Sequence, residues 1–398
     1  MKKITYGKNS YDGREIKAVV DTLKQTTQMS KNVNKFEKKI SKKFSSRYGV
    51  MVNSGSSAII IALKLLNFRR NDEVIVPCLN FGTAISSLML LALKPIFVDI
   101  NVQTLQINED EIEKKITKKT KALMIPNLIG NIPNWRKIRK IGKKYGLKII
   151  EDSADTLDAT FSGKSTGCYA DMSITSFYGS HIISCAGNGG MLILKKKKDY
   201  ERGKVLRSWG RLSSILNDSE NISDRLNIKL NGFDYDKKFV FQECGFNFEP
   251  SEIGAAFGLE QLKKLTKFSK KRKLNFNYHF NFFSKLKKYF ILPVVNKNVK
   301  TNFLAYPIII RKEAKFKRKD LQLYLEKSNI QTRPIFSGNI MRHPAFMKLS
   351  LNKNNISNFP NSDFIMKNGI LIGCHQGLNQ IDLKFVHQKI LSFLKTIN

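Results

Sequence analysis

The chain has 398 residues, 42% of them hydrophobic and only 10 of them proline, which excludes a disordered, collagen-like or low-complexity protein. This length is enough for two or three domains, or for one large and one small domain. Lysine and arginine number 69 against 32 acidic residues, so the formal net charge is +37.

Strands and helices alternate through the first half of the chain. Short apolar runs predict buried strands, and longer segments with apolar residues on one face predict helices. The predicted strands are Glu73–Pro77, Pro95–Asp99, Ala122–Pro126, Leu147–Glu151, Ser173–Phe177 and Met191–Leu194. The predicted helices between them are Gly55–Phe68, Thr83–Leu93, Glu109–Lys115 and Pro133–Tyr145.

This alternation is typical of βαβ units and predicts an α/β fold with a mostly parallel central sheet. In such a sheet, ligands bind beyond the carboxyl ends of the strands. The polar residues that directly follow the predicted strands are therefore the candidates for a functional site.

The pattern changes in the second half of the chain. Residues 212–240 are polar and irregular and are expected to form a long loop, and a smaller α+β arrangement follows from about residue 302. We expect an N-terminal segment (1–30) that packs with the small domain, a large domain (31–270) and a small C-terminal domain (271–398). The elements predicted here are helices at Glu252–Thr266, Lys271–Tyr289, Lys319–Ser328 and Gln380–Thr396, and strands at Phe303–Ile310 and Ile330–Arg333.

The positive charge is spread over the chain in short basic clusters. It is explained either by a nucleic-acid-binding surface or by a solvated lysine-rich surface that attracts anions weakly. No nucleic-acid-binding motif accompanies the clusters, and they lack the interleaved aromatic residues of a single-strand platform. We therefore expect no nucleic-acid partner.

The cysteines and the hydropathy pattern indicate a cytoplasmic protein. Five widely spaced cysteines form no CxxC pair and no cluster with histidine, which predicts neither a metal site nor a disulfide framework. The N-terminal residues lack the apolar segment of a signal peptide. The longest apolar stretch, Ile85–Ile100, is interrupted by Lys94 and Pro95 and is too short to cross a bilayer, so no membrane partner is expected.

The first candidate segment runs from Asn53 to Ala58 (NSGSSA), at the start of a predicted helix. Free N–H groups and the positive end of a helix, together with serine hydroxyls, make an anion site. Serine and glycine are also ordinary N-cap residues, so a simple helix cap explains this segment on its own as well.

The second candidate segment runs from Glu151 to Asp155 (EDSAD), directly after a predicted strand. An aspartate at the carboxyl end of a strand is able to pair with a protonated ring nitrogen, which makes the ring an electron sink, as pyridoxal chemistry requires. The alternative is a carboxylate that only caps a helix or a turn.

Two further segments complete a set of four. They are Ser173–His181 (SITSFYGSH), followed by Gly187–Met191 (GNGGM), and Gly245–Glu252 (GFNFEPSE), which opens a helix. In this order the four segments resemble the N-S-G-T-x-A, E-D-x-A-Q, S-F-x-x-x-K and G-Y-N-x-R motifs of the DegT/DnrJ/EryC1/StrS family of sugar aminotransferases and dehydratases. The resemblance extends from about residue 5 to the C-terminus. It implies the aspartate-aminotransferase fold (fold type I) and pyridoxal 5'-phosphate or pyridoxamine 5'-phosphate as cofactor.

The resemblance also implies which residues hold the cofactor phosphate. Gly55, Ser56 and Ser57 match the family's phosphate-binding turn, and Ser176 adds a hydroxyl. Asn247 matches a residue that reaches the phosphate from the neighbouring subunit. The resemblance therefore implies a homodimer with shared active sites.

The cofactor ring has matching residues too. By resemblance, Phe81 stacks on the pyridine ring, Asp152 pairs with the ring nitrogen, and Asp155 lies beside the phenolic oxygen.

The lysine that binds the cofactor covalently in this family should stand at position 181, where the chain has His181. The next lysine, Lys195, lies beyond a Gly-rich turn and a strand, so a shift in register cannot supply one. An imidazole cannot form that covalent bond, but it is able to move protons. A lone histidine is usually structural, but its place in the motif marks His181 as the candidate catalytic residue.

This exchange resembles the family's histidine-containing nucleotide-sugar 3-dehydratase branch, of the GDP-4-keto-6-deoxymannose 3-dehydratase type. The segments Arg207–Arg211 (RSWGR) and Thr332–Asn339 (TRPIFSGN) are similar to segments of that branch. The resemblance implies removal of the C3 hydroxyl of a nucleotide-linked 4-keto-6-deoxyhexose, in the biosynthesis of 3,6-dideoxysugars of surface polysaccharides such as O-antigen. Because Cys185 and Cys244 stand singly, we expect glutamate as the amino donor that resets the cofactor, not an iron–sulfur cluster.

Two alternatives stay open at this point. One is a nucleotide-sugar aminotransferase that works through free pyridoxamine phosphate. The other is a non-catalytic binding protein that keeps the fold and uses its basic surface. The nucleotide and the roles of Arg207, Arg211 and Arg333 are also left open, since each arginine is able to bind either a diphosphate or a carboxylate.

Overall fold

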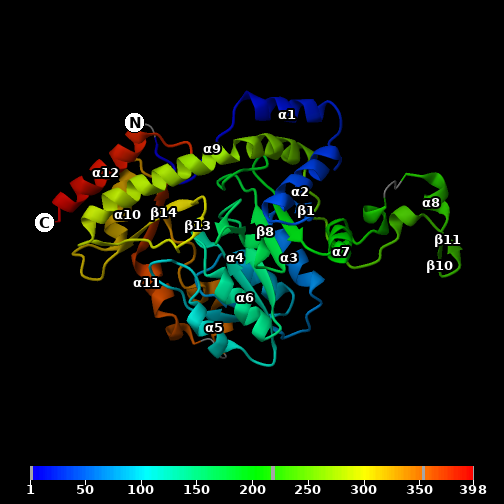
Figure 1. Cartoon of the computed structure of the whole chain (residues 1–398), viewed down its shortest axis with the longest axis horizontal. Coiled ribbons are helices and arrows are strands. Elements are labelled where there is room, and N and C mark those ends of the chain that lie inside the picture. The colour runs from blue at the N-terminus through cyan, green and yellow to red at the C-terminus, as the bar shows by residue number, and fades with distance from the viewer. Residues whose placement is uncertain (1–2, 217–219, 352–354, 398) are drawn as a thin grey trace.

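A seven-stranded sheet forms the centre of the protein (Figure 1). The computed structural model describes residues 3–216, 220–351 and 355–397. Of the seven strands, one runs antiparallel to its neighbours, namely the strand that contains Met191. The other pairs are parallel, which confirms the predicted α/β fold with a mostly parallel sheet. In order across the sheet the strands are β1 (Tyr48–Val52), β9 (Gly190–Leu194), β8 (Met172–Ser176), β5 (Lys148–Asp152), β4 (Thr120–Pro126), β2 (Glu73–Pro77) and β3 (Lys94–Val98).

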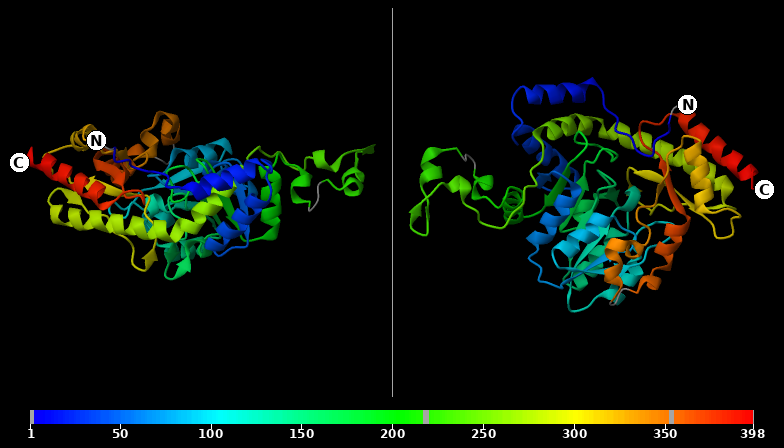
Figure 2. Two further views of the ribbon diagram at one scale, coloured as in Figure 1. Left: turned by 90° about the horizontal axis from the view of Figure 1, so that it is seen from above. Right: turned by 180° about the vertical axis from the view of Figure 1, so that it is seen from behind.

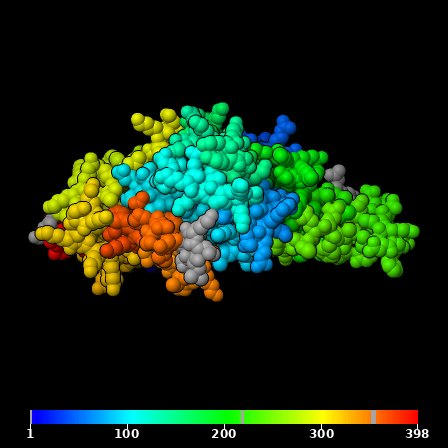
Figure 3. Space-filling view, turned by 90° about the horizontal axis from the view of Figure 1, so that it is seen from below, coloured from blue at the N-terminus to red at the C-terminus, as the bar shows by residue number. Residues whose placement is uncertain are grey.

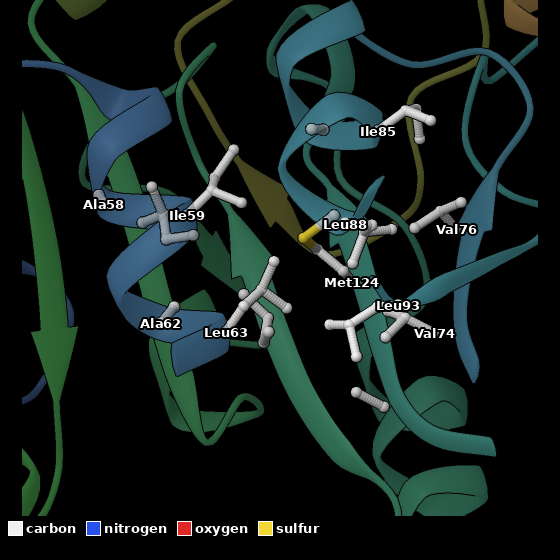
Figure 4. Close-up of a cluster of buried hydrophobic side chains, with 14 of the residues drawn as sticks. Ala58, Ile59, Ala62, Leu63, Val74, Val76, Ile85, Leu88, Leu93 and Met124 are labelled. Carbon is white, nitrogen blue, oxygen red and sulfur yellow. The ribbon is translucent and has the colours of Figure 1, made fainter. Parts of the chain in front are cut away.

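Side chains alternate between the two faces of this sheet, as the period of two in a strand requires. Val74 and Val76 of β2 pack against α3 (Gly55–Leu65) and α4 (Gly82–Leu90), whereas Ile75 joins a core on the opposite face. Figure 4 shows the first of these cores, where side chains of the two helices meet those of β2 and β4.

Helices also cover the opposite face. α5 (Glu109–Lys115) and α6 (Trp135–Lys144) lie over β2, β3 and β4. α2 (Lys31–Lys43) and the N-terminal part of the long helix α9 (Glu252–Phe283) lie over β1 and β9. The sheet is therefore enclosed on both sides, which leaves the carboxyl ends of its strands as the natural place for a ligand. A further helix, α7 (Lys197–Arg207), follows β9.

A second, smaller sheet lies beside the first. It is antiparallel and packs against the C-terminal half of α9 and against three further helices, with aromatic and branched aliphatic side chains in its core. In order its strands are β12 (Phe290–Ile291), β14 (Ala305–Ile310), β16 (Gly369–Gly373) and β15 (Arg333–Pro334), and the helices are α10 (Arg318–Lys327), α11 (Pro360–Asn368) and α12 (Gln380–Lys395). A three-stranded sheet of β13 (Val299–Lys300), β6 (Thr160–Phe161) and β7 (Lys164–Ser165) joins the two regions.

One continuous helix, α9 (Glu252–Phe283), contributes side chains to both cores (Figure 1). The prediction of two helices, Glu252–Thr266 and Lys271–Tyr289, was therefore wrong. The residues between them are lysine, phenylalanine and serine, none of which stops a helix, and neither glycine nor proline interrupts it there. Because the helix crosses residue 270 without a break, the division of the chain into 1–30, 31–270 and 271–398 stays a prediction.

An arm projects from one end of the molecule (Figures 2 and 3). It contains α8 (Ile222–Leu226) and a hairpin of β10 (Lys229–Leu230) and β11 (Phe233–Asp234), so the predicted long loop over 212–240 contains short regular elements. Backbone hydrogen bonds between residues 208–212 and 240–247 form its base. From here on, the arm means the described residues 212–216 and 220–241.

The N-terminal residues run along the small sheet before the first helix, α1 (Gly13–Leu23), which lies on α9 (Figure 1). Ile4 pairs with Ile330, and the amide of Tyr6 donates to Gln331 Oε1 at 2.9 Å. The strand predicted at Ile330–Arg333 is therefore shifted, since Ile330 forms this isolated bridge and β15 begins three residues later. Among residues 3–216, 220–351 and 355–397, no helix is both long enough and apolar enough to span a bilayer.

The junction between β9 and the start of α3 tolerates no side chain at Gly190. A Cβ atom on Gly190 would lie 2.3 Å from the carbonyl group of Ser54 and 2.5 Å from the amide of Gly55, all backbone atoms. We expect Gly190→Ala to lower the free energy of unfolding by about 1–3 kcal/mol, as overpacking does, with a lower midpoint of thermal unfolding. Gly13→Ala is the matched control, because nothing lies within 4 Å of its Cβ position. Equal midpoints for the two variants would contradict this packing.

Candidate active site

A cavity of about 420 Å³ opens at the carboxyl ends of β5 and β8 and the N-terminal ends of α3 and α4. Seven of the nine predicted site residues line it: Gly55, Ser56, Phe81, Asp152, Asp155, Ser176 and His181. These residues come from four separate parts of the chain (55–56, 81, 152–155 and 176–181), and the fold brings them together beside the carboxyl ends of the strands.

The start of α3 approaches the end of β8 closely. A Cβ atom on Gly55 would lie 3.0 Å from the Cβ atom of Ser176, so a side chain at position 55 would crowd the strand end. Ser54 caps the helix by accepting from the amide of Ser57 at 3.1 Å, and Ser56 Oγ donates to Thr83 Oγ1 at 3.0 Å. The first amides of the helix have no acceptor within it, which suits this end for an anion.

Two predicted site residues lie outside the cavity lining. Ser57 is buried, and its hydroxyl donates to Asn53 Oδ1 at 2.6 Å, so it stabilises the turn that precedes the helix. Asn247 is exposed at the base of the arm, where its backbone forms a bridge with Ser208. Within one chain, neither residue contacts the space that the other seven surround.

Phe81 presents its ring to the cavity from the residue before α4. Its side chain is 58% exposed, although it is a large aromatic residue in a folded protein. Phe336 lines the opposite part of the cavity and meets Phe81 edge to face, with the ring centroids 6.2 Å apart. An exposed aromatic face at a cavity wall is suited to stacking on a planar ring.

Two carboxylates lie at the end of β5 without a cation beside them. Burial, together with the negative charge of Glu151, raises the pKa of Asp152 to about 6, against the effect of the bond it accepts from the Ala154 amide at 3.0 Å. Burial and the neighbouring Asp152 raise the pKa of Asp155 to about 7. Each carboxylate would be stabilised in its ionised form by a positively charged group in the cavity.

Asp155 is also tied to a strained turn. Its Oδ2 accepts from the amide of Ile129 at 2.8 Å, and Ile129 has φ 59° and ψ 13°, a left-handed conformation that is costly for a β-branched residue. The bond to the carboxylate helps to hold this conformation, and it fixes the orientation of Asp155.

His181 follows β8 in a short turn, where its amide donates to the Tyr178 carbonyl at 2.9 Å. Its Nδ1 lies 3.4 Å from the carbonyl oxygen of Ser176. A carbonyl only accepts hydrogen bonds, so this contact requires the proton on Nδ1 and leaves Nε2 as the nitrogen that is able to take up a proton. Burial, and then the charge of Arg272, lower the pKa of His181 to about 4, so the ring is neutral at physiological pH.

Sequence reasoning did not select several polar and aromatic residues of the cavity. Tyr178 and Asn188 lie inside motifs that the sequence analysis identified, and Phe336 lies in the TRPIFSGN segment, so these motifs already indicated that the three residues are close to the site. Asn80 and Thr83 had no such signal and are brought to the cavity by the start of α4.

The three arginines left open by the sequence occupy different environments. Arg207 is 2% exposed and donates to Glu37 Oε1 at 2.8 Å, so its guanidinium is held in an internal ion pair. Arg211 lies over the ring of Trp209, with its guanidinium carbon 4.4 Å from the ring centroid. Arg333 is exposed on β15 and donates to the Thr332 carbonyl at 2.7 Å. None of the three lines the cavity.

Comparison with known proteins agrees with this architecture. The family model described as the DegT/DnrJ/EryC1/StrS aminotransferase family matches residues 9–391. The chain is 30% identical to the GDP-4-keto-6-deoxy-D-mannose 3-dehydratase of Escherichia coli O55:H7, over 92% of this chain and 94% of that protein. It is also 30% identical to the GDP-perosamine synthase of Escherichia coli O157:H7, over 90% of this chain and 94% of that protein.

A solved structure is similar over nearly the whole length of the chain. It is a GDP-4-keto-6-deoxymannose-3-dehydratase with a trapped PLP-glutamate geminal diamine, with a TM-score of 0.83 and 28% identity over 97% of this chain and 99% of that one. The match of the family model, the fold and the order of the four site segments lead to one conclusion: the chain belongs to the DegT/DnrJ/EryC1/StrS aminotransferase family.

Proposed function

We propose that the protein is a pyridoxal- or pyridoxamine-phosphate-dependent enzyme that removes the C3 hydroxyl of a nucleotide-linked 4-keto-6-deoxyhexose, with His181 as its proton carrier. The observation that carries this proposal is a histidine in a cavity whose described lining contains no lysine and which also holds Asp152 and the free amides of a helix start. The proposal extends to the biosynthesis of deoxysugars for surface polysaccharides.

The residues of the cavity fit the cofactor on the properties of this chain. The start of α3 supplies free amides and the hydroxyl of Ser56 for a phosphate, and Ser176 lies against it. Asp152 is a half-buried carboxylate that forms no ion pair with any described residue, and a protonated ring nitrogen would supply the missing charge. Phe81 offers an exposed ring face for stacking.

The chain's own groups then have separate tasks. When bound, pyridoxamine phosphate supplies the amine that condenses with the 4-keto group and the electron sink that lets the C3 hydroxyl leave. Asp152 keeps the ring nitrogen protonated, and the turn at Ile129 holds Asp155 in place. Nε2 of His181 takes up a proton and returns it to the departing hydroxyl, because the ring is neutral and Nδ1 is held by Ser176.

The names of the relatives support the choice of substrate and amino donor. A relative named for GDP-4-keto-6-deoxy-D-mannose makes this GDP-linked sugar the first substrate to test. The neighbour that contains a PLP-glutamate adduct supports glutamate as the donor that resets the cofactor.

A second candidate is amination of the same kind of sugar. It is favoured by the description of the matching family as an aminotransferase family and by a relative named GDP-perosamine synthase. The two candidates differ in product, since dehydration removes one hydroxyl and amination replaces the keto oxygen by an amine.

The first prediction concerns the proton carrier. With pyridoxamine phosphate and GDP-4-keto-6-deoxymannose, we expect the natural protein to form a product that lacks one hydroxyl, measured by mass spectrometry. His181→Asn should slow this reaction by about 10²–10⁴-fold, the usual contribution of a positioned acid or base. The cofactor absorbance of the variant should stay, which separates loss of chemistry from loss of the cofactor.

Two results would count against the proposal. Undiminished deoxygenation by His181→Lys would show that the imidazole is not needed. A 4-amino sugar from the natural protein would favour the aminotransferase.

We also propose a homodimer in which the arm contacts a second copy of the chain. Seven large apolar side chains on the arm are exposed, among them Phe233 at 75% and Ile222 at 72%. Such a set on a projecting segment is unfavourable in water and is typical of an interface. Asn247 at the base of the arm would then approach the partner's cavity, as the family resemblance implies.

The second prediction tests the arm. We expect the double change Ile222→Ser and Phe233→Ser to weaken dimerisation by about tenfold or more, because buried aromatic anchors dominate interface energies. Sedimentation velocity over a range of concentrations measures this change. Ile381→Ser on α12 is the control, since Ile381 is equally exposed, at 77%, but lies away from the arm. An unchanged dimer in the arm variant would exclude this role.

A further inference from the structure

Arg272 of α9 is fully buried, at 0% exposure, although its guanidinium carries a charge. Among the residues that the structure describes, no carboxylate lies within ion-pair distance of it. Tyr6 and Cys374 are the two titratable groups that act on its charge, and burial raises the pKa of both, that of Cys374 to about 12. At neutral pH these two groups are uncharged, so the positive charge of Arg272 has no counterion.

The hydrogen bonds of Arg272 join three parts of the chain. Nη1 donates to the carbonyls of Phe303 and Leu304 at 2.9 and 3.0 Å, and Nε donates to Gln376 Oε1 at 2.7 Å. These acceptors lie before β14 and after β16 in the small sheet. Nη2 donates to the carbonyl of His181 at 3.3 Å. The guanidinium thus connects the small sheet to the turn that carries His181.

Burial of the Arg272 guanidinium costs desolvation free energy, which hydrogen bonds between segments alone do not explain. A buried charge that binds only neutral groups costs several kcal/mol of desolvation, and an uncharged amide would bind a carbonyl without that cost. We therefore expect the positive charge of Arg272 to have a role besides hydrogen bonding. His181, whose carbonyl accepts from Arg272, also has an ionisable imidazole that lines the cavity.

We propose that Arg272 is a positioning residue for His181, which fixes the turn through the His181 carbonyl and keeps the imidazole neutral through its uncompensated positive charge. This inference rests on the proposed function, in which a neutral His181 accepts a proton. A protonated imidazole has no free nitrogen for that task, so the enzyme needs a device that disfavours the charged ring.

The other charged groups around His181 act in known directions. Asp152 and Asp155 at the end of β5 line the same cavity and, when ionised, would favour the charged ring. The ring centroid of Tyr178 lies 5.8 Å from that of His181. Burial raises the pKa of Tyr6 in the N-terminal segment, so this phenol is neutral at neutral pH. Burial lowers the pKa of His181, the hydrogen bond to the Ser176 carbonyl raises it, and the charge of Arg272 lowers it further. The charge of Arg272 also adds to burial in lowering the pKa of His375.

Two substitutions separate charge from hydrogen bonding. Arg272→Gln removes the charge and keeps an amide donor, whereas Arg272→Lys keeps the charge and loses the planar fork. The chain has only five histidines, so the titration of His181 is resolvable by NMR of the full-length protein labelled at histidine Cε1, with His181→Asn to assign its signal.

The third prediction is a rise in the pKa of His181 by about one unit or more in Arg272→Gln, because loss of a nearby positive charge favours the imidazolium. In Arg272→Lys the pKa should stay near that of the natural protein. The loss of reaction rate on the acid side of the pH profile should move to higher pH in Arg272→Gln only. An equal shift in both variants, or none in either, would overturn the proposal.

A milder change covers the case in which the Arg272 variants do not fold. Gln376→Glu keeps the acceptor for Nε and places a negative charge beside the guanidinium. It should raise the pKa of His181 in the same direction, and an unchanged pKa would also overturn the proposal. Since the NMR titration needs no turnover, failure of this inference is distinguishable from failure of the proposed function, which would appear as absent deoxygenation in the natural protein.

Discussion

The contact between Nδ1 of His181 and the carbonyl of Ser176 is the interaction on which the site depends. It fixes one tautomer of the ring, because a carbonyl accepts and never donates. Nε2 is then the single nitrogen of the ring that is able to exchange a proton. Burial lowers the pKa of the ring, so Nε2 is unprotonated at neutral pH and has a free lone pair, which a proton acceptor requires.

The surrounding fold explains why this contact forms. Ser176 is the last residue of β8, and His181 comes back to its carbonyl after a turn in which the His181 amide donates to the Tyr178 carbonyl. The absence of a Cβ atom at Gly55 and Gly190 lets the start of α3 approach the same strand ends. A helix start with free amides, two carboxylates and an imidazole therefore share one cavity.

The sequence predicted this cavity well because strand ends are set by local patterns. The strands LKIIE and SITSF differ by one residue from those observed, and the motifs at their ends supplied four of the seven predicted residues that line the cavity, namely Asp152, Asp155, Ser176 and His181. The single helix α9, the arm and the bonds of Arg272 depend on contacts between distant segments, which a hydrophobic period does not encode. The direction of the Ser57 hydroxyl is likewise not encoded in a hydrophobic period, since it is decided by the turn at Asn53.

The central claim is that the cofactor is held without a covalent bond to the chain. Borohydride reduction of the protein with bound pyridoxal phosphate, followed by measurement of the intact mass, tests it most directly. The account predicts an unchanged mass of the chain, because an imidazole stands where the family has its lysine. A mass increase that matches one reduced pyridoxyl phosphate group, located on a lysine by peptide sequencing, would contradict it.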